Sequence, residues 1–136
     1  MYFIELINVT GRDQAGLTAM LTDRLAGANV MILDMGQAVI HDFLTLGLMI
    51  RCETGREGVI DDLARVFHER GLVVSRTRVA EEDYDAWVQR QGQSRTILTL
   101  LARSISADQL AVISNLIADA GLNIDHINRL SGRIPL

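Results

Sequence analysis

The strongest structural signal in the chain is FLTLGLMIRCE at residues 43–53, where Leu, Ile or Cys occupies every second position. This period of two is typical of a strand with one covered face and one open face. The positions that we expect helices to cover are Leu44, Leu46, Leu48, Ile50 and Cys52. A tight turn at His41-Asp42 precedes the strand, so residues 30–40 are predicted to form the other strand of a hairpin.

Helical spacing flanks this hairpin on both sides. Apolar residues recur at steps of three and four after Gly16 and again between Gly55 and Gly71, whereas residues 2–10 and 72–80 have the composition of strands. The predicted order over residues 1–80 is therefore βαββαβ. This order is the ferredoxin-like pattern, an α+β fold with both helices on one face of an antiparallel sheet. Right-handed crossovers leave few other ways to wind it.

The pattern starts again after a polar, acidic segment at residues 81–94, which we interpret as a linker. Residues 95–102 and 123–129 are predicted strands, and the helix between them has Leu110, Ile113, Leu116, Ile117 and Ala120 on one face. Gly121-Leu122-Asn123-Ile124 also echoes Gly27-Ala28-Asn29-Val30. We therefore predict a tandem repeat.

The second copy, residues 95–136, is only half present, because no second hairpin, helix and fourth strand follow. In a ferredoxin-like sheet the third strand lies between the first and second, so such a half would leave strand edges and an apolar helix face open. Residues 132–136 are predicted to be a loop leading into a missing part. We expect a longer parent protein, or another chain that completes the sheet.

The main candidate for ligand binding is the loop Gly11-Arg12-Asp13-Gln14-Ala15-Gly16, which joins the first strand to the first helix. A Gly-flanked turn that opens a helix leaves several backbone N–H groups free around one point. These groups suit a carboxylate and Asp13 suits an ammonium, which together describe an amino acid. The alternative is a plain tight turn in which Asp13 caps the helix.

Composition excludes several functional classes. The chain has 13 basic and 17 acidic residues, a net charge of −4 and 4% aromatic residues, which argues against a nucleic-acid partner. Cys52 is the one cysteine, so neither an internal disulfide nor a multi-cysteine zinc site is available, as is common in the cytoplasm. The apolar runs are too short to predict export or a membrane partner.

Catalytic and metal-binding patterns are weak in this sequence. Asp83-Tyr84-Asp85 has the spacing of an Asp-x-Asp phosphatase motif, but Ala80-Glu81-Glu82 precedes it in place of a buried strand. His41, His68 and His126 are far apart and show no metal-ligand spacing. We therefore predict no catalytic residue, metal site or cofactor in this chain.

Asp13-Gln14-Ala15-Gly16 before a helix, with Gly27-Ala28-Asn29-Val30 entering the second strand, resembles the ACT domain, an amino-acid-sensing module of metabolic enzymes. The closer resemblance is to the N-terminal tandem ACT region of bacterial phosphoserine phosphatases. It covers essentially the whole chain and rests on Gly11-Arg12-Asp13, His41-Asp42-Phe43, Tyr84 with Trp87, residues 100–110 and residues 129–136. In those enzymes a haloacid-dehalogenase-type domain follows and hydrolyses phosphoserine with magnesium, so the resemblance implies magnesium only there.

The resemblance implies a serine-binding, homodimeric regulatory module in which Asp13 and the asparagine that opens strand two contact the ligand. That asparagine is Asn29, or Asn123 in the second copy, contributed across an interface by a facing copy. The expected ligand-binding residues are Gly11, Asp13, Gln14, Ala15, Gly16, Asn29 and Asn123. The chain departs from the family at Ala15, where many loops have Pro, and at Ala102, where relatives often have Gly. Asn29 has an alternative role as a helix-end residue in a left-handed conformation.

Two other functions use the same fold. Acylphosphatases have a Gly-Arg-x-Gln-Gly-type phosphate cradle, which Gly11-Arg12-Asp13-Gln14-Ala15 resembles, with Asn29 as the residue that would orient water. The Asp13 carboxylate would repel a phosphate in that cradle, which argues against this activity. A pure dimerisation module is the third hypothesis, and serine binding would separate it from the first.

Overall fold

The computed structural model describes residues 1–130 and divides the chain into two compact units, Met1–Gln93 and a second unit that begins at Ser94. The predicted closing loop at residues 132–136 lies outside the described residues. Every strand of the described chain belongs to the first unit.

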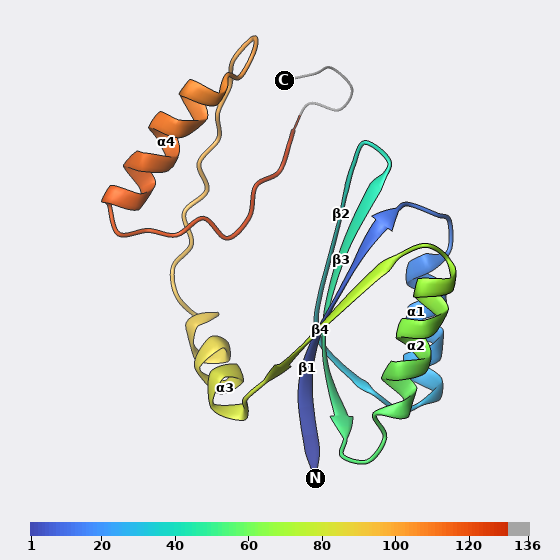
Figure 1. Ribbon diagram of the computed structural model, residues 1–136. Helices are drawn as coiled ribbons and strands as arrows, with labels where there is room; N and C mark the ends of the chain where they lie inside the picture. Colours follow the sequence, from blue (N-terminus) through green and yellow to red (C-terminus); the bar gives the residue numbers. More distant parts are fainter. Residues whose placement is uncertain (131–136) are drawn as a thin grey trace. The chain divides into compact units, whose positions relative to one another are not determined.

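The first unit contains a four-stranded antiparallel sheet with two helices on one face (Figure 1). Its elements are β1 (Tyr2–Arg12), α1 (Leu17–Gly27), β2 (Met31–Ile40), β3 (Phe43–Glu53), α2 (Gly58–Glu69) and β4 (Val73–Val79). The strand order across the sheet is β2-β3-β1-β4, so β1 and β3 are central. The predicted ferredoxin-like fold is confirmed.

The core lies between the sheet and the two helices. The predicted covered face of β3 is buried throughout, at Leu44, Leu46, Leu48, Ile50 and Cys52. The helices cover it with side chains spaced three or four residues apart: Leu17, Leu21 and Leu25 from α1, and Ile60, Leu63 and Phe67 from α2. Because this spacing gathers each triplet on one side of its helix, the sequence period accounts for the packing.

The segment predicted as a linker contains a helix, α3 (Glu81–Arg90). Three acidic residues in its first turn favour the positive end of the helix dipole. Arg51 of β3 holds the helix to the sheet, because its Nη2 lies 3.2 Å from a Glu81 oxygen and its guanidinium lies 5.3 Å from the Tyr84 ring centre. The description of residues 81–94 as a polar linker is therefore corrected for its first ten residues.

Among its described residues, the second unit has one helix, α4 (Ala107–Asp119), where the apolar spacing predicted it. Ser106 and Gln109 form a capping box that satisfies backbone N–H groups at its start. The strands predicted at 95–102 and 123–129 are absent from the described residues. The physical reason is that these two segments do not pair with each other in a ferredoxin-like order, and the described residues of the second unit supply no strand to lie between them.

A buried ion network joins β1, β4 and α2. Glu5 of β1 is 3% exposed, and Arg76 of β4 donates to both of its carboxylate oxygens from Nε and Nη2. Arg76 also donates to Asp61 of α2, and Arg78 lies 3.9 Å from Glu5. The Glu5 hydrogen bond, followed by that to Asp61, raises the pKa of Arg76 above its ordinary value, so the guanidinium stays charged.

We expect Arg76→Leu to lower the free energy of unfolding by about 2–4 kcal/mol, because it leaves the Glu5 carboxylate buried with Arg78 alone. The double variant Glu5→Leu/Arg76→Leu should regain most of this loss, since no buried charge then lacks its partner. Urea unfolding of both variants measures the difference. Equal destabilisation in the two variants would contradict this account.

Gly11 packs against the start of β4. Its φ is +152°, and a Cβ at this position would lie 2.6 Å from Leu72 Cδ2 and 3.3 Å from Leu72 Cα. Leu72 is 1% exposed and has little room to move.

Gly11→Ala should therefore destabilise the first unit by about 1–3 kcal/mol. Gly27→Ala is the matched control, because Gly27 lies in α1 with no heavy atom within 4 Å of an added Cβ. That control should be neutral or stabilising by up to about 1 kcal/mol. Thermal unfolding of the two variants provides the test, and equal melting temperatures would count against the packing argument.

Candidate functional site

The predicted ligand loop joins β1 to α1 at the end of the sheet. Gly16 is the N-cap of α1 with φ 84°, and no side chain caps the helix. Within the described residues, the backbone N–H groups of Ala15 and Gly16 have no hydrogen-bond acceptor. The Asp13 side chain is exposed and makes no bond there. The loop therefore presents free N–H groups at the positive end of a helix, beside a carboxylate.

Two groups of the loop are already engaged by the protein. The backbone N–H of Asp13 donates to the carbonyl of Asp42 at 2.7 Å. The Gln14 side chain donates from Nε2 to the carbonyl of Arg70 at 3.1 Å, just after α2. Gln14 thus ties the loop to the neighbouring helix end, and its side-chain amide is occupied.

The hairpin between β2 and β3 clamps the loop. Asp42 accepts a hydrogen bond from Arg12 on one carboxylate oxygen and contacts the Nδ1 of His41 with the other. The Arg12 guanidinium also lies 5.3 Å from the centre of the Phe43 ring. The hydrogen bond to His41, and then the charge of Arg12, hold the pKa of Asp42 below its usual value. Asp42 is therefore charged at neutral pH and positions the loop.

Sequence reasoning treated His41-Asp42 only as a turn and gave no role to Arg12 in this contact. Strand register could have revealed the contact between Arg12 and Asp42. Arg12 pairs with Phe43 at the end of the β1–β3 ladder, which places the hairpin tip beside the start of the loop. An acidic residue at that tip is then within reach of Arg12.

Asn29 lies at the other end of α1. Its φ of 60° places it in the left-handed region, and the N–H of Val30 donates to the carbonyl of Leu25 across it. The alternative helix-end role of Asn29 is therefore what the backbone shows. Since α1 has 11 residues, roughly 16 Å of helix separates Asn29 from the loop. One copy of the chain does not bring Asp13 and Asn29 together.

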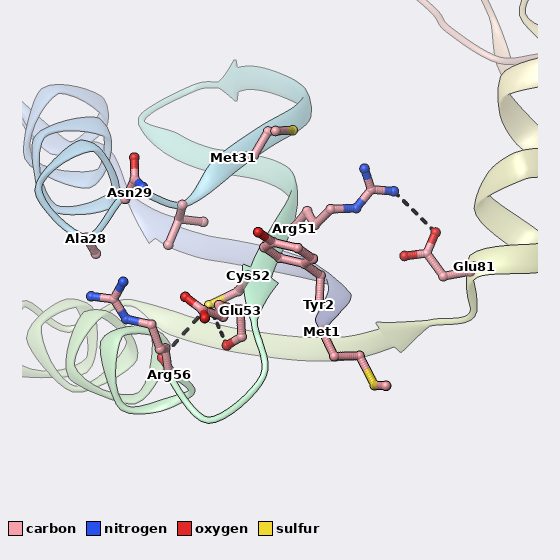
Figure 2. A pocket seen from close by; sticks show the side chains of 11 residues that line it. Met1, Tyr2, Ala28, Asn29, Met31, Arg51, Cys52, Glu53, Arg56 and Glu81 are labelled. Carbon is pink, nitrogen blue, oxygen red and sulfur yellow. Dashed lines mark hydrogen bonds and ion pairs between the residues drawn. The ribbon is translucent and has the colours of Figure 1, made fainter.

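A shallow pocket of about 840 Å³ surrounds Asn29 (Figure 2). Its wall is built from the start of β1, the entry to β2 and the end of β3, and its charged residues are Arg51, Glu53, Arg56 and Glu81. Arg51 is paired with Glu81, whereas the Arg56 side chain has no hydrogen bond or ion pair to the described residues. The pocket therefore offers a cation and an amide to a polar ligand.

Cys52 also lines this pocket but is itself buried. Burial raises the pKa of its thiol, with the charge of Glu57 adding to the effect. The thiol is therefore neutral near neutral pH and is a poor nucleophile. Sequence reasoning missed the pocket because residues from three separate strand ends form it.

Asn123 lies in the second unit, just after α4. The left-handed residue there is Gly121, with φ 74°, and the N–H of Leu122 donates to the carbonyl of Ile117. Helix-end geometry thus makes Gly121 the counterpart of Asn29, and Asn123 lies two positions further on. The sequence echo that aligned the two asparagines is corrected, because Gly and Asn both tolerate the left-handed helix end.

The described residues include neither a metal-binding cluster nor a membrane-spanning helix. Residues 1–130 contain no group of three or more His, Cys, Asp or Glu side chains placed to hold a metal ion. None of the helices in this part of the chain has the length and apolar character that a membrane span requires.

Two phosphoserine phosphatases are similar to this chain. Phosphoserine phosphatase SerB2 of Mycobacterium tuberculosis is 36% identical over 129 residues. The phosphoserine phosphatase of Streptomyces coelicolor is 32% identical over 128 residues. Each match covers 93% of this chain and 30% of the relative, so the chain spans about 30% of the length of these curated relatives.

Solved structures agree on the fold. A protein assigned as a glycine cleavage system transcriptional repressor superposes with a TM-score of 0.56 at 18% identity, over 61% of this chain and 49% of that protein. The C-terminal domain of the MgtC protein from Mycobacterium tuberculosis gives 0.50 at 13% identity, over 58% and 89%. Residues 4–77, which include all of the first unit's core except Phe3, match the ACT domain family, and the chain belongs to that family.

Proposed function

We propose that this chain is the regulatory, amino-acid-binding part of a phosphoserine phosphatase and that its ligand is serine. Membership of the ACT family and similarity to two phosphoserine phosphatases support this proposal. The catalytic domain, with its magnesium, belongs to the part of such an enzyme that this chain does not cover. A cytoplasmic location is part of the proposal, since a lone buried cysteine suits a reducing compartment.

One observation carries the ligand assignment: two unbonded backbone N–H groups, at Ala15 and Gly16, lie within three residues of the exposed Asp13 carboxylate. The N–H groups at the start of α1 donate hydrogen bonds to the carboxylate of an amino acid. Asp13 pairs with its ammonium group. Gly11 and Gln14 shape the loop, Gly11 by its packing against Leu72 and Gln14 by its bond to Arg70.

A facing copy would bring an asparagine to this loop. β2 is an edge strand, and Met31, Ile32, Val39 and Ile40 are exposed along it. β2 runs from the Asn29 end of the unit to the hairpin that clamps the loop. Antiparallel pairing of two β2 edges therefore sets Asn29 of one copy at the level of the other copy's loop. Asn123 of a second unit is the other asparagine available for this role.

We expect Asp13→Ala to weaken serine binding about 10- to 150-fold, because a charge-assisted contact is worth ~1.5–3 kcal/mol. Asp23→Ala is the matched control, since it removes an exposed carboxylate of α1 outside the loop and should leave affinity unchanged. Isothermal titration of the chain and both variants with serine measures the effect. Equal affinity in the Asp13→Ala variant would remove Asp13 from the site. No binding of any common amino acid would reduce the chain to an interaction module.

The clamp at Asp42 should make the loop sensitive to acid. Because the folded-state pKa of Asp42 lies below its ordinary value, the stabilisation that Asp42 provides is fully present above that ordinary value and is lost as pH falls through the lowered pKa. We therefore expect Asp42→Asn to lower the melting temperature at about pH 5 and to have a smaller effect at about pH 2. Thermal unfolding at both pH values tests this. An effect at pH 2 as large as that at pH 5 would show that the Asp42 charge is not the cause.

A further inference from the structure

The pocket beside Asn29 lies within the first unit and is separate from the loop at Gly11–Gly16. Its volume is about 840 Å³, and all the residues that line it belong to the first unit (Figure 2). No residue of the Gly11–Gly16 loop contributes to its wall. The pocket is therefore a second candidate site on one copy of the chain, and it does not depend on serine binding at Asp13.

A twofold relation within the first unit accounts for the place of this pocket. Ile7 of β1 pairs with Leu48 of β3, and each lies ten residues before the first residue of the following helix. Each strand–helix loop therefore approaches the end of the other helix. At one end the Gln14 side chain bonds to the backbone just after α2. At the other end Arg56 and Asn29 line the pocket together, just after α1.

Two opposite charges in the pocket have no partner among the described residues. The Arg56 guanidinium and the Glu53 carboxylate belong to exposed residues, and neither group makes a hydrogen bond or ion pair in residues 1–130. The other two charged side chains of the pocket, Arg51 and Glu81, already form an ion pair at 3.2 Å. The pocket thus offers one free cation and one free anion to a ligand.

Backbone geometry keeps these two charges close together. The N–H of Arg56 donates to the carbonyl of Glu53 at 3.1 Å, which closes a tight turn after β3. The first and last residues of such a turn have Cα atoms within about 7 Å of each other. A ligand that carries a carboxylate and an ammonium on the same carbon atom can therefore reach both side chains at once.

Apolar surface lies beside the two charges. Tyr2 and Met31 line the pocket and are 61% and 57% exposed, and Ala28 and Val30 add to the same wall. An aliphatic ligand side chain would remove part of this surface from water, which favours binding. A ligand as polar as serine would leave the apolar wall uncovered.

We infer that this pocket binds an α-amino acid with an apolar side chain, such as leucine. The carboxylate of the ligand pairs with Arg56, its ammonium group pairs with Glu53, and its side chain packs against Tyr2 and Met31. The first unit then has two amino-acid sites of different selectivity, one at each end of α1.

NMR titration of the isotope-labelled full chain with leucine tests this inference, because it locates even weak binding. We expect the backbone amide signals of residues 54–56 to shift and saturate, while those of Gly11–Gly16 stay in place. Isocaproate, which is leucine without its ammonium group, and isoamylamine, which is leucine without its carboxylate, should each bind about 5-fold more weakly or worse. Equal affinity for leucine and either analogue would overturn the inference, as would leucine that shifts no signal at the pocket.

Charge-removing variants supply the second measurement. Arg56→Gln and Glu53→Gln should each weaken leucine binding about 5- to 10-fold. Arg65→Gln is the matched control, since it removes an exposed arginine of α2 that does not line the pocket, and it should leave the affinity unchanged.

The two pocket variants should keep the melting temperature of the parent chain, because neither side chain has a bonded partner in the described residues. Leucine affinity that Arg56→Gln leaves unchanged would overturn the inference. Serine titration of the same variant separates the two sites, because a serine site at Gly11–Gly16 does not use Arg56. Loss of leucine binding in the Asp13→Ala variant would place leucine at the loop and would also overturn the inference.

Discussion

Burial of one face of the four-stranded sheet beneath α1 and α2 is the constraint on which the other features of the first unit depend. Because side chains alternate along a strand, Leu or Ile at every second position of β3 places that whole face in the core. The helices cover the face only by returning across the same side, which puts each strand–helix loop at an end of the sheet. The loop from Gly11 to Gly16 therefore lies where the free N–H groups of α1 gather.

The second unit shows which elements local sequence can form when no sheet face is buried. α4 forms because its hydrogen bonds are internal and because Ser106 and Gln109 satisfy its first turn. Residues 95–102 have the composition of a strand, yet a strand needs a neighbour for its backbone groups, and the described chain offers none. The same apolar pattern thus yields a packed core in the first unit and, among the described residues, an open groove beside α4 in the second.

Much of the fold followed from the period of the apolar residues. The βαββαβ order and the buried face of β3 were predictable because both depend on spacing within a few residues. α3 was missed because its charged first turn resembles a solvated linker, and only the contact of Arg51 with Glu81 and Tyr84 shows its attachment. The candidate loop was found from its glycines and from Asp13, whereas its clamp was not.

The sequence by itself determined the helices and strands of the first unit, the buried face of its sheet and the loop with its carboxylate. Each of these features depends on residues that are close together in the chain. Tertiary structure alone decided which loop groups remain free. It joined Asp42 to Arg12 across 30 positions and Arg76 to Glu5 across 71. It also placed Asn29 and Asp13 at opposite ends of α1. Such pairings depend on strand register and helix length, and a shift of one residue in register would turn every side chain of a strand to the other face.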